Sequence, residues 1–204
     1  MRKIFIDCGA HCGESINRAK RQFGSDTLIV SFEALPTLAE QLQELYTDDD
    51  LVQVVNAAVY IKDDTLNFNI SPAFTDGSSI LKTLNNNHLA TTIEVPCFDL
   101  STWIKDSFSP NDYLILKLDI EGAEYDVLEK MVADGTLSMV SELWGEWHYG
   151  HIINNLTEQE KPQFTDRVEA LNSNLKELNK SMSIWEAYYN PTEKVITRPK
   201  SLYE

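Results

Sequence analysis

Two short stretches of the sequence contain most of the residues whose types and spacing suit chemistry. The first, FIDCGAHCGES from Phe5 to Ser15, places an aspartate before a turn with two glycines. The second, LKLDIEGAE from Leu116 to Glu124, places acidic residues directly after an apolar run. Both stretches put carboxylates at the end of an expected buried strand, which is where open α/β sheets bind their ligands.

Zinc is one interpretation of the first stretch, through Cys8, His11 and Cys12. A structural zinc site needs four nitrogen or sulfur ligands, commonly from two paired groups. The third cysteine, Cys97, stands alone in the sequence. Cys8 also shares one side of the expected strand with Ile4 and Ile6, so we expect it in the core rather than on a metal.

A dinucleotide fingerprint is a second interpretation, and it requires G-x-G-x-x-G after the first strand. Here His11 stands where the middle glycine would be, and the carboxylate of Asp7 suits an ammonium group better than a pyrophosphate. Glu33 ends the next expected strand, where a carboxylate can accept both hydroxyls of a ribose. S-adenosylmethionine, a cation without phosphate, fits this pattern. An NAD-dependent oxidoreductase and a non-catalytic binding scaffold are the alternatives.

Strand and helix patterns alternate along most of the chain and predict parallel strands with right-handed crossovers. Helices are expected from the glycine turn to about Gln22, from Pro36, and from Glu121 to Val132. The residues between 60 and 97 interrupt the alternation and are interpreted as a β-rich insertion. The central strands are expected at Lys3–Asp7, Leu28–Phe32, Leu51–Val59, Tyr113–Asp119 and Leu137–Trp144.

The last third of the sequence predicts one more helix and a closing hairpin. Thr157 and Glu160 have the spacing of a capping box. An apolar stripe follows, which we expect to pack on the sheet, with a homodimer seam as the alternative. Its members are Phe164, Val168, Leu171, Leu175 and Leu178. Residues 183–189 and 192–197, joined at Asn190-Pro191, are interpreted as the hairpin.

Composition limits the functional classes further. A chain of 204 residues is most simply a single domain, and its net charge of −15 makes nucleic acid and membranes poor partners. The sequence has no apolar run of the roughly 20 residues that span a bilayer. Its three cysteines, an odd number, favour a reducing, cytoplasmic setting.

Six stretches, in this order, resemble the FkbM family of S-adenosylmethionine-dependent methyltransferases over about residues 4–148. They are Phe5–Ser15, Phe32-Glu33-Ala34, Asn56-Ala57-Ala58-Val59, Gly77-Ser78-Ser79, Phe98-Asp99-Leu100 and Leu116–Glu124. The sequence departs from the family where Ala34-Leu35-Pro36 follows Glu33, because proline more often comes directly after the glutamate. No family motif is recognisable beyond about Tyr149.

The resemblance implies a class I methyltransferase (Rossmann-like) α/β fold, with seven mostly parallel strands and an antiparallel strand in the C-terminal hairpin. It also implies O-methylation of a small-molecule hydroxyl acceptor, often a sugar or a natural-product scaffold. The residues expected to bind S-adenosylmethionine are Asp7, Gly9, Ala10, His11, Gly13, Ser15, Glu33, Ala34, Ala58, Ser79, Asp119 and Glu121.

Methyl transfer to a weakly nucleophilic hydroxyl benefits from a base or a metal ion. Asp119 is the first candidate for base or metal ligand, and His148 is a second candidate for the base. Asp119, Glu146 and His148 could together hold Mg²⁺ or Mn²⁺, with Glu142 as a further acidic neighbour. Trp144 and Trp147 are candidates for the walls of an acceptor pocket.

Overall fold

The structure is a computed structural model that describes residues 1–70, 78–81, 91–186 and 196. Its elements in chain order are β1 (Lys3–Cys8), α1 (Glu14–Phe23), β2 (Leu28–Glu33), α2 (Pro36–Leu45), β3 (Val52–Asn56), β4 (Ala58–Tyr60), β5 (Asp64–Ile70), β6 (Thr91–Asp99), α3 (Leu100–Ser107), β7 (Tyr113–Leu118), α4 (Glu124–Ala133), a 3-10 helix (Thr136–Met139), β8 (Val140–Gly145), α5 (Tyr149–Asn155), α6 (Lys161–Glu177) and β9 (Met182–Ile184).

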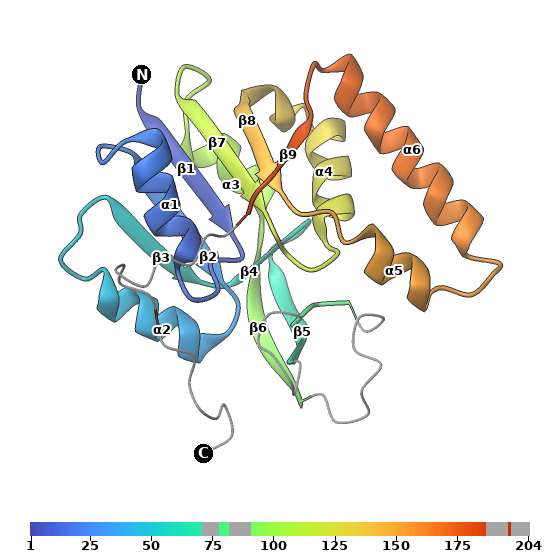
Figure 1. The fold of residues 1–204 in the computed structure, drawn as a ribbon, viewed down its shortest axis with the longest axis horizontal. Coiled ribbons are helices and arrows are strands. Elements are labelled where there is room, and N and C mark those ends of the chain that lie inside the picture. The colour runs from blue at the N-terminus through green and yellow to red at the C-terminus, as the bar shows by residue number, and fades with distance from the viewer. Residues whose placement is uncertain (71–77, 82–90, 187–195, 197–204) are drawn as a thin grey trace.

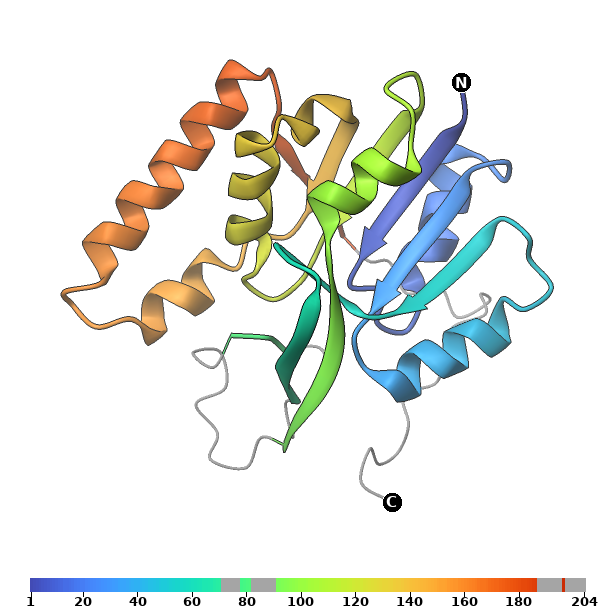
Figure 2. The same cartoon turned by 180° about the vertical axis from the view of Figure 1, so that it is seen from behind.

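The central sheet has the strand order β3-β2-β1-β7-β8-β9, and each neighbouring pair is parallel. Its strands are apolar on both faces, as expected for a parallel sheet between helices. On β1, Ile4 and Ile6 pack with α3 and α4 on one face, while Phe5 packs with α1 and α2 on the other. Figures 1 and 2 show the resulting three layers.

The predicted strand Leu51–Val59 is divided between two sheets. Its first part, β3, pairs with β2 in the central sheet, and after Ala57 the chain continues as β4. Strand β4 pairs with β6, which also pairs with β5, in a separate three-stranded sheet. This sheet, the predicted β-rich insertion, lies beyond the carboxyl ends of the central strands (Figure 1). It therefore closes the edge where ligands are expected to bind.

The sheet differs from the prediction at its C-terminal edge. Strand β9 is parallel to β8, with Leu143 opposite Met182 and Gly145 opposite Ile184. The described sheet therefore has six strands, all parallel, rather than seven with one antiparallel. The second arm of the predicted hairpin falls on residues 192–197, of which only Ile196 is described.

Two predicted boundaries are wrong, for local reasons. Helix α4 begins at Glu124 rather than Glu121, because Glu121 and Gly122 have φ values of 54° and 100° and cannot start a right-handed helix. The strand predicted from Leu137 starts at Val140, because residues Thr136–Met139 form the 3-10 helix.

The capping box predicted at Thr157 and Glu160 is confirmed in part. The helix that follows it, α6, packs on a different neighbour than predicted. The Glu160 carboxylate accepts hydrogen bonds from the N–H and hydroxyl of Thr157 at 2.9 and 2.6 Å, and α6 begins at Lys161. The stripe on α6 packs mainly on α4 rather than on the sheet; the ring centroids of Phe164 and Tyr125 are 5.1 Å apart. None of the helices in the described ranges has the length and apolar character needed to cross a bilayer.

Candidate active site

A pocket of about 390 Å³ lies at the carboxyl ends of β1, β2 and β7, facing the three-stranded sheet. Its described lining includes five acidic side chains and no lysine or arginine. The acidic residues are Glu14, Glu33, Asp119, Glu121 and Glu146. Such a lining favours a cationic ligand and opposes a pyrophosphate.

The loop after β1 approaches β7 so closely that a side chain at Gly9 would not fit. Gly9 has φ of 90°, and a Cβ there would lie 2.0 Å from the carbonyl oxygen of Asp119. Gly13, also at 90°, lies against Leu42 and ends the loop where α1 begins. His11 has φ of 48°, a left-handed conformation that is uncommon outside glycine, asparagine and aspartate. Gly9, Ala10 and His11 line the pocket, whereas Gly13 supports the turn behind it.

Glu33, at the end of β2, is anchored by two backbone N–H groups. Its Oε2 accepts from His11 N–H at 2.7 Å and its Oε1 from Leu35 N–H at 2.8 Å. The residue is only 6% exposed. Burial raises its pKa to about 7, although the hydrogen bonds from Leu35 and His11 act in the opposite direction. Each carboxylate oxygen keeps a lone pair for a ligand hydroxyl.

Small residues open the part of the pocket beside Glu33. Ala34 follows β2, Ala57 and Ala58 lie where β3 passes into β4, and all three line the pocket, as does Ser15 from the first turn of α1. Larger apolar side chains, among them Phe32, Phe68 and Ile80, also line the pocket. A flat apolar group therefore has room here next to the Glu33 carboxylate.

Ser79, which was predicted to contact the cofactor, does not line the pocket. Its hydroxyl donates to the carbonyl oxygen of Glu121 at 2.8 Å and accepts from Leu81 N–H at 3.0 Å. It is 1% exposed and is not among the described lining residues, whereas Ser78 is. Ser79 therefore ties the insertion to the loop after β7, and its neighbour faces the pocket.

Asp7 lies beneath the loop rather than on the pocket wall. It is fully buried; its Oδ1 lies 3.0 Å from Lys117 Nζ, and its Oδ2 accepts from the Ser31 hydroxyl at 3.2 Å. Lys117 Nζ also donates to the carbonyl oxygen of Gly9 at 2.9 Å. Burial alone would lower the pKa of Lys117, but Asp7 and Asp119 raise it above its ordinary value. Asp7 thus organises the loop through Lys117, and the structure gives it no direct contact with the pocket.

Three carboxylates gather where β7 and β8 end. Asp119, Glu121 and Glu146 all line the pocket, and Glu146 N–H donates to the carbonyl oxygen of Leu118 at 3.0 Å, which joins the two strand ends. Burial raises the pKa of Glu121 to about 7; His148 lowers it, while Asp119 and other nearby carboxylates raise it. The structure thus brings these predicted acidic residues together at one edge of the sheet.

His148 lies directly behind these carboxylates and is 4% exposed. Its Nδ1 lies 2.9 Å from Glu124 Oε1, and its Nε2 lies 3.4 Å from Glu121 Oε2 and 3.9 Å from Asp119 Oδ1. Burial lowers its pKa, but the hydrogen bond to Glu124 and the surrounding carboxylates outweigh this and raise it to about 9. The imidazole therefore carries a proton at neutral pH, which does not suit the predicted role of general base.

The aromatic residues predicted to shape an acceptor pocket pack elsewhere. Trp144 contacts Phe23 and Trp185 on the α1 side of the sheet, and its indole N–H donates to Glu142 at 3.0 Å. Trp147 packs against Tyr125. Because strand side chains alternate between faces, Glu142 and Trp144 share the α1 face of β8, and neither is among the described residues that line the pocket.

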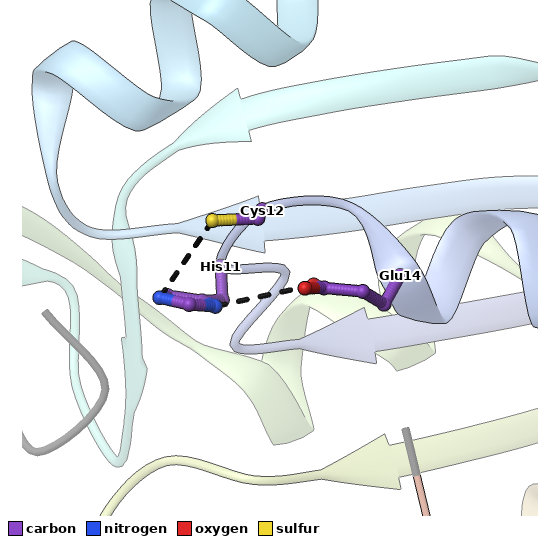
Figure 3. Close-up of side chains that lie close together, drawn as sticks. All are labelled: His11, Cys12 and Glu14. Atoms are coloured by element: carbon purple, nitrogen blue, oxygen red, sulfur yellow. Dashed lines mark hydrogen bonds and ion pairs between the residues drawn. The ribbon is translucent and has the colours of Figure 1, made fainter. Parts of the chain in front are cut away.

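The zinc interpretation remains disfavoured, because Cys8 packs in the core with Ile4 and Ile6. Figure 3 shows a different group near the loop: His11, Cys12 and Glu14. Cys12 Sγ lies 3.8 Å from His11 Nε2, and His11 Nδ1 lies 3.9 Å from Glu14 Oε2. Cys12 is itself 2% exposed and packs with Leu35 and Leu38, so its position is explained by the core.

Sequence reasoning missed two charged residues at the site. Glu14, the first residue of α1, lines the pocket; its signal was an acidic residue directly after the glycine turn. Lys117 is 1% exposed inside the otherwise apolar strand YLILKL. A lysine in a central parallel strand is rarely buried without a partner, and this was the signal for a buried carboxylate nearby.

The parallel sheet and the pocket at its strand ends define an α/β protein of the Rossmann-like class. The family model of the methyltransferase FkbM domain matches residues 7–178. The chain therefore belongs to the FkbM methyltransferase family. The resemblance seen in the sequence is confirmed by this match.

A solved structure to which this chain is similar is the crystal structure of methyltransferase FkbM from Methylobacillus flagellatus KT. The two proteins are 16% identical, with a TM-score of 0.41. The match covers 65% of this chain and 30% of that chain. A search of the curated proteins found no match.

Proposed function

We propose that the protein is an S-adenosylmethionine-dependent methyltransferase that methylates a hydroxyl group of a small molecule, such as a sugar or a natural-product scaffold. The observation that carries this proposal is Glu33, a buried carboxylate at the end of β2 that lines the pocket beside Ala57 and Ala58. In this proposal the Glu33 carboxylate accepts hydrogen bonds from the two ribose hydroxyls, and the small alanine side chains leave room for the purine ring.

The residues of the pocket fit this cofactor. The carboxylate lining suits its positive charge, and the side-chain-free backbone at Gly9 permits close approach to the loop. Glu33 would hold the ribose, and Ala10 and His11 would line the methionyl end. The volume of about 390 Å³ is within the usual range of small-molecule sites. When bound, S-adenosylmethionine supplies an electrophilic methyl group on a sulfonium.

In this proposal Asp119 is the residue that acts on the acceptor. It lies at the end of β7, lines the pocket, and its side chain is 32% exposed. As the acceptor oxygen bonds to the methyl carbon and the carbon–sulfur bond breaks, the hydroxyl proton passes to the Asp119 carboxylate. Lys117, whose Nζ is 3.6 Å from Asp119 Oδ2, places a buried positive charge beside this carboxylate.

Calorimetric titration with S-adenosylmethionine tests the proposal. We expect micromolar binding by the wild type and roughly 30-fold weaker binding by Glu33→Gln, which corresponds to about 2 kcal/mol for hydrogen bonds to a charged group. Glu40→Gln, an exposed position on α2, is the matched control and should bind as the wild type does. Binding of NADH in place of S-adenosylmethionine would contradict the proposal, as would an unchanged affinity in Glu33→Gln.

A further inference from the structure

Three metal-ligating side chains meet at the pocket edge formed by β7 and β8. Their donor atoms, on Asp119, Glu146 and His148, lie within 4.8 Å of one another. The Glu146 N–H bond to the Leu118 carbonyl fixes the two strand ends side by side. Because Asp119 and Glu146 line the pocket, an ion held here would face its interior.

His148 is supported in the way that metal-binding histidines usually are. Its Nδ1 is held by Glu124 at 2.9 Å, and Glu124 is fully buried and fixed by the N–H groups of Ile120 and Gly122, each at 2.9 Å. A carboxylate on one ring nitrogen orients the other toward a metal. In the described part of the chain, Nε2 has only longer contacts, to Glu121 at 3.4 Å and Asp119 at 3.9 Å. This buried nitrogen is therefore directed at the carboxylates without a short hydrogen bond of its own.

We propose that Asp119, Glu146 and His148 bind one divalent cation of the Mn²⁺ or Mg²⁺ class. Bonds of about 2.1 Å place neighbouring ligand atoms roughly 3 to 4 Å apart, so the observed separations require only a small closing movement. Glu146 is exposed, so we expect its side chain to change rotamer at little cost. Two hard carboxylates with one imidazole suit Mn²⁺ in particular.

The role of the ion, but not its binding, rests on the proposed methyltransferase function. An ion bound here would release the proton of His148 Nε2 to solvent, bind one oxygen of the Asp119 carboxylate and coordinate the oxygen of the acceptor hydroxyl. The other Asp119 oxygen would still accept the hydroxyl proton. Coordination lowers the pKa of that hydroxyl and fixes its oxygen at the pocket edge. The acceptor is then expected to offer two neighbouring oxygens to the ion, as a sugar diol does.

Titration of the metal-free protein with MnCl₂, followed by electron paramagnetic resonance, tests the site in the absence of cofactor and acceptor. We expect one Mn²⁺ per chain, displaced by excess MgCl₂, and at least tenfold weaker binding in Glu146→Gln and Asp119→Asn. Echo-modulation spectra should show one coordinated nitrogen that is lost in His148→Gln. Glu169→Gln, an exposed position on α6, is the matched control and should bind Mn²⁺ as the wild type does.

The outcomes separate this proposal from the proposed function. Mn²⁺ binding that is retained in Glu33→Gln, while S-adenosylmethionine binding is weakened as expected, would show that the two sites are independent. Weak Mn²⁺ binding without a nitrogen signal, or binding reduced equally by Glu169→Gln, would overturn the metal site and leave the methyltransferase proposal in place. If His148→Gln fails to fold, Glu146→Gln decides the result, because its side chain is exposed.

Discussion

The ammonium group of Lys117 lies 3.0 Å from Asp7 Oδ1, and both side chains are buried in the centre of the sheet. The two residues are opposite each other in the register of β1 and β7. From this position Lys117 also donates to the carbonyl oxygen of Gly9. One buried ion pair thus connects two strands that end at the site to the loop that lines the pocket.

Removing one member of this pair should destabilise the protein strongly. Lys117→Met leaves the Asp7 carboxylate buried without its partner, which typically costs about 3–5 kcal/mol. The free energy of unfolding, measured by urea denaturation, should fall by that amount. Lys62→Met, which breaks an exposed ion pair with Asp64, is the control and should cost less than about 1 kcal/mol.

The double variant Lys117→Met, Asp7→Asn separates charge from packing. Because it removes both charges, it should recover a substantial part of the lost stability. A Lys117→Met variant that loses less than about 1 kcal/mol would contradict a major stabilising role for the buried pair.

The sequence predicts the site best where the chemistry depends on strand ends. Glu33 and Asp119 were expected at strand ends and both line the pocket there, because parallel strands in one sheet end at a common edge. The Asp7–Lys117 pair could not be predicted, since the register of β1 against β7 joins residues that are far apart in the sequence. Local periodicity carries no information about that register.

The direction in which side chains point was the second feature that could not be predicted from the sequence. Ser79 was the predicted cofactor contact, yet Ser78 lines the pocket instead, because the Asn69–Ser79 bridge to β5 turns Ser79 toward the insertion. Trp144 was predicted at the pocket, but its face of β8 packs on Phe23 and Trp185. In each case a contact distant in sequence decides the orientation.

A series of glycine-to-alanine variants separates backbone strain from close contact. Gly150, in α5, has open space at its Cβ position, so alanine there should be neutral or stabilise by up to about 1 kcal/mol. Gly135 has φ of 74° and open space, so alanine should cost about 1–2 kcal/mol. Gly9→Ala adds a contact of 2.0 Å to the Asp119 carbonyl and should cost more than Gly135→Ala.

The melting temperatures of the three variants give their order of stability, and titration with S-adenosylmethionine gives their affinity. Only Gly9→Ala should lose affinity, because only this glycine of the three lines the pocket. A Gly9→Ala variant that melts and binds like Gly135→Ala would show that the loop and β7 separate easily.

The backbone at His11 is expected to matter more than its ring. Asparagine tolerates a φ of 48° and preserves the N–H bond to Glu33, so His11→Asn should keep both stability and cofactor affinity. Valine is β-branched and strained in this conformation, so His11→Val should lose about 1–3 kcal/mol and bind S-adenosylmethionine more weakly. Chemical denaturation and calorimetry measure the two effects. Normal binding with a large loss of turnover in His11→Asn would instead assign the ring a catalytic role.

Cofactor affinity should depend on pH through Glu33. Burial raises the pKa of this carboxyl to about 7 in the free protein, and ribose hydroxyls would donate to its ionised form. Binding therefore releases a proton below pH 7, and the affinity should rise up to tenfold per pH unit until about pH 7 and then level off. Calorimetry at about pH 6, 7 and 8 in buffers of different ionisation enthalpy measures both the affinity and the proton released.

The raised pKa of Glu33 predicts the opposite pH dependence for the stability of the free protein, which should fall as the pH rises. The folded pKa of Glu33 lies above the ordinary value of 4.5, so the folded state binds more protons than the unfolded state between about pH 4.5 and 7. This contribution to the free energy of unfolding is fully present below about pH 4.5 and is lost as the pH rises through 7. Glu33→Gln should remove it.

Glu121 has a pKa raised to a similar value and lines the same pocket, so it is the matched control for the pH dependence. Glu121→Gln should keep the change in affinity between about pH 6 and 7, whereas Glu33→Gln should flatten it. If Glu121→Gln flattens the dependence and Glu33→Gln does not, the proton released on binding comes from the end of β7. The ribose contact assigned to Glu33 would then be wrong, because a carboxylate that accepts two hydroxyls has to lose its proton first.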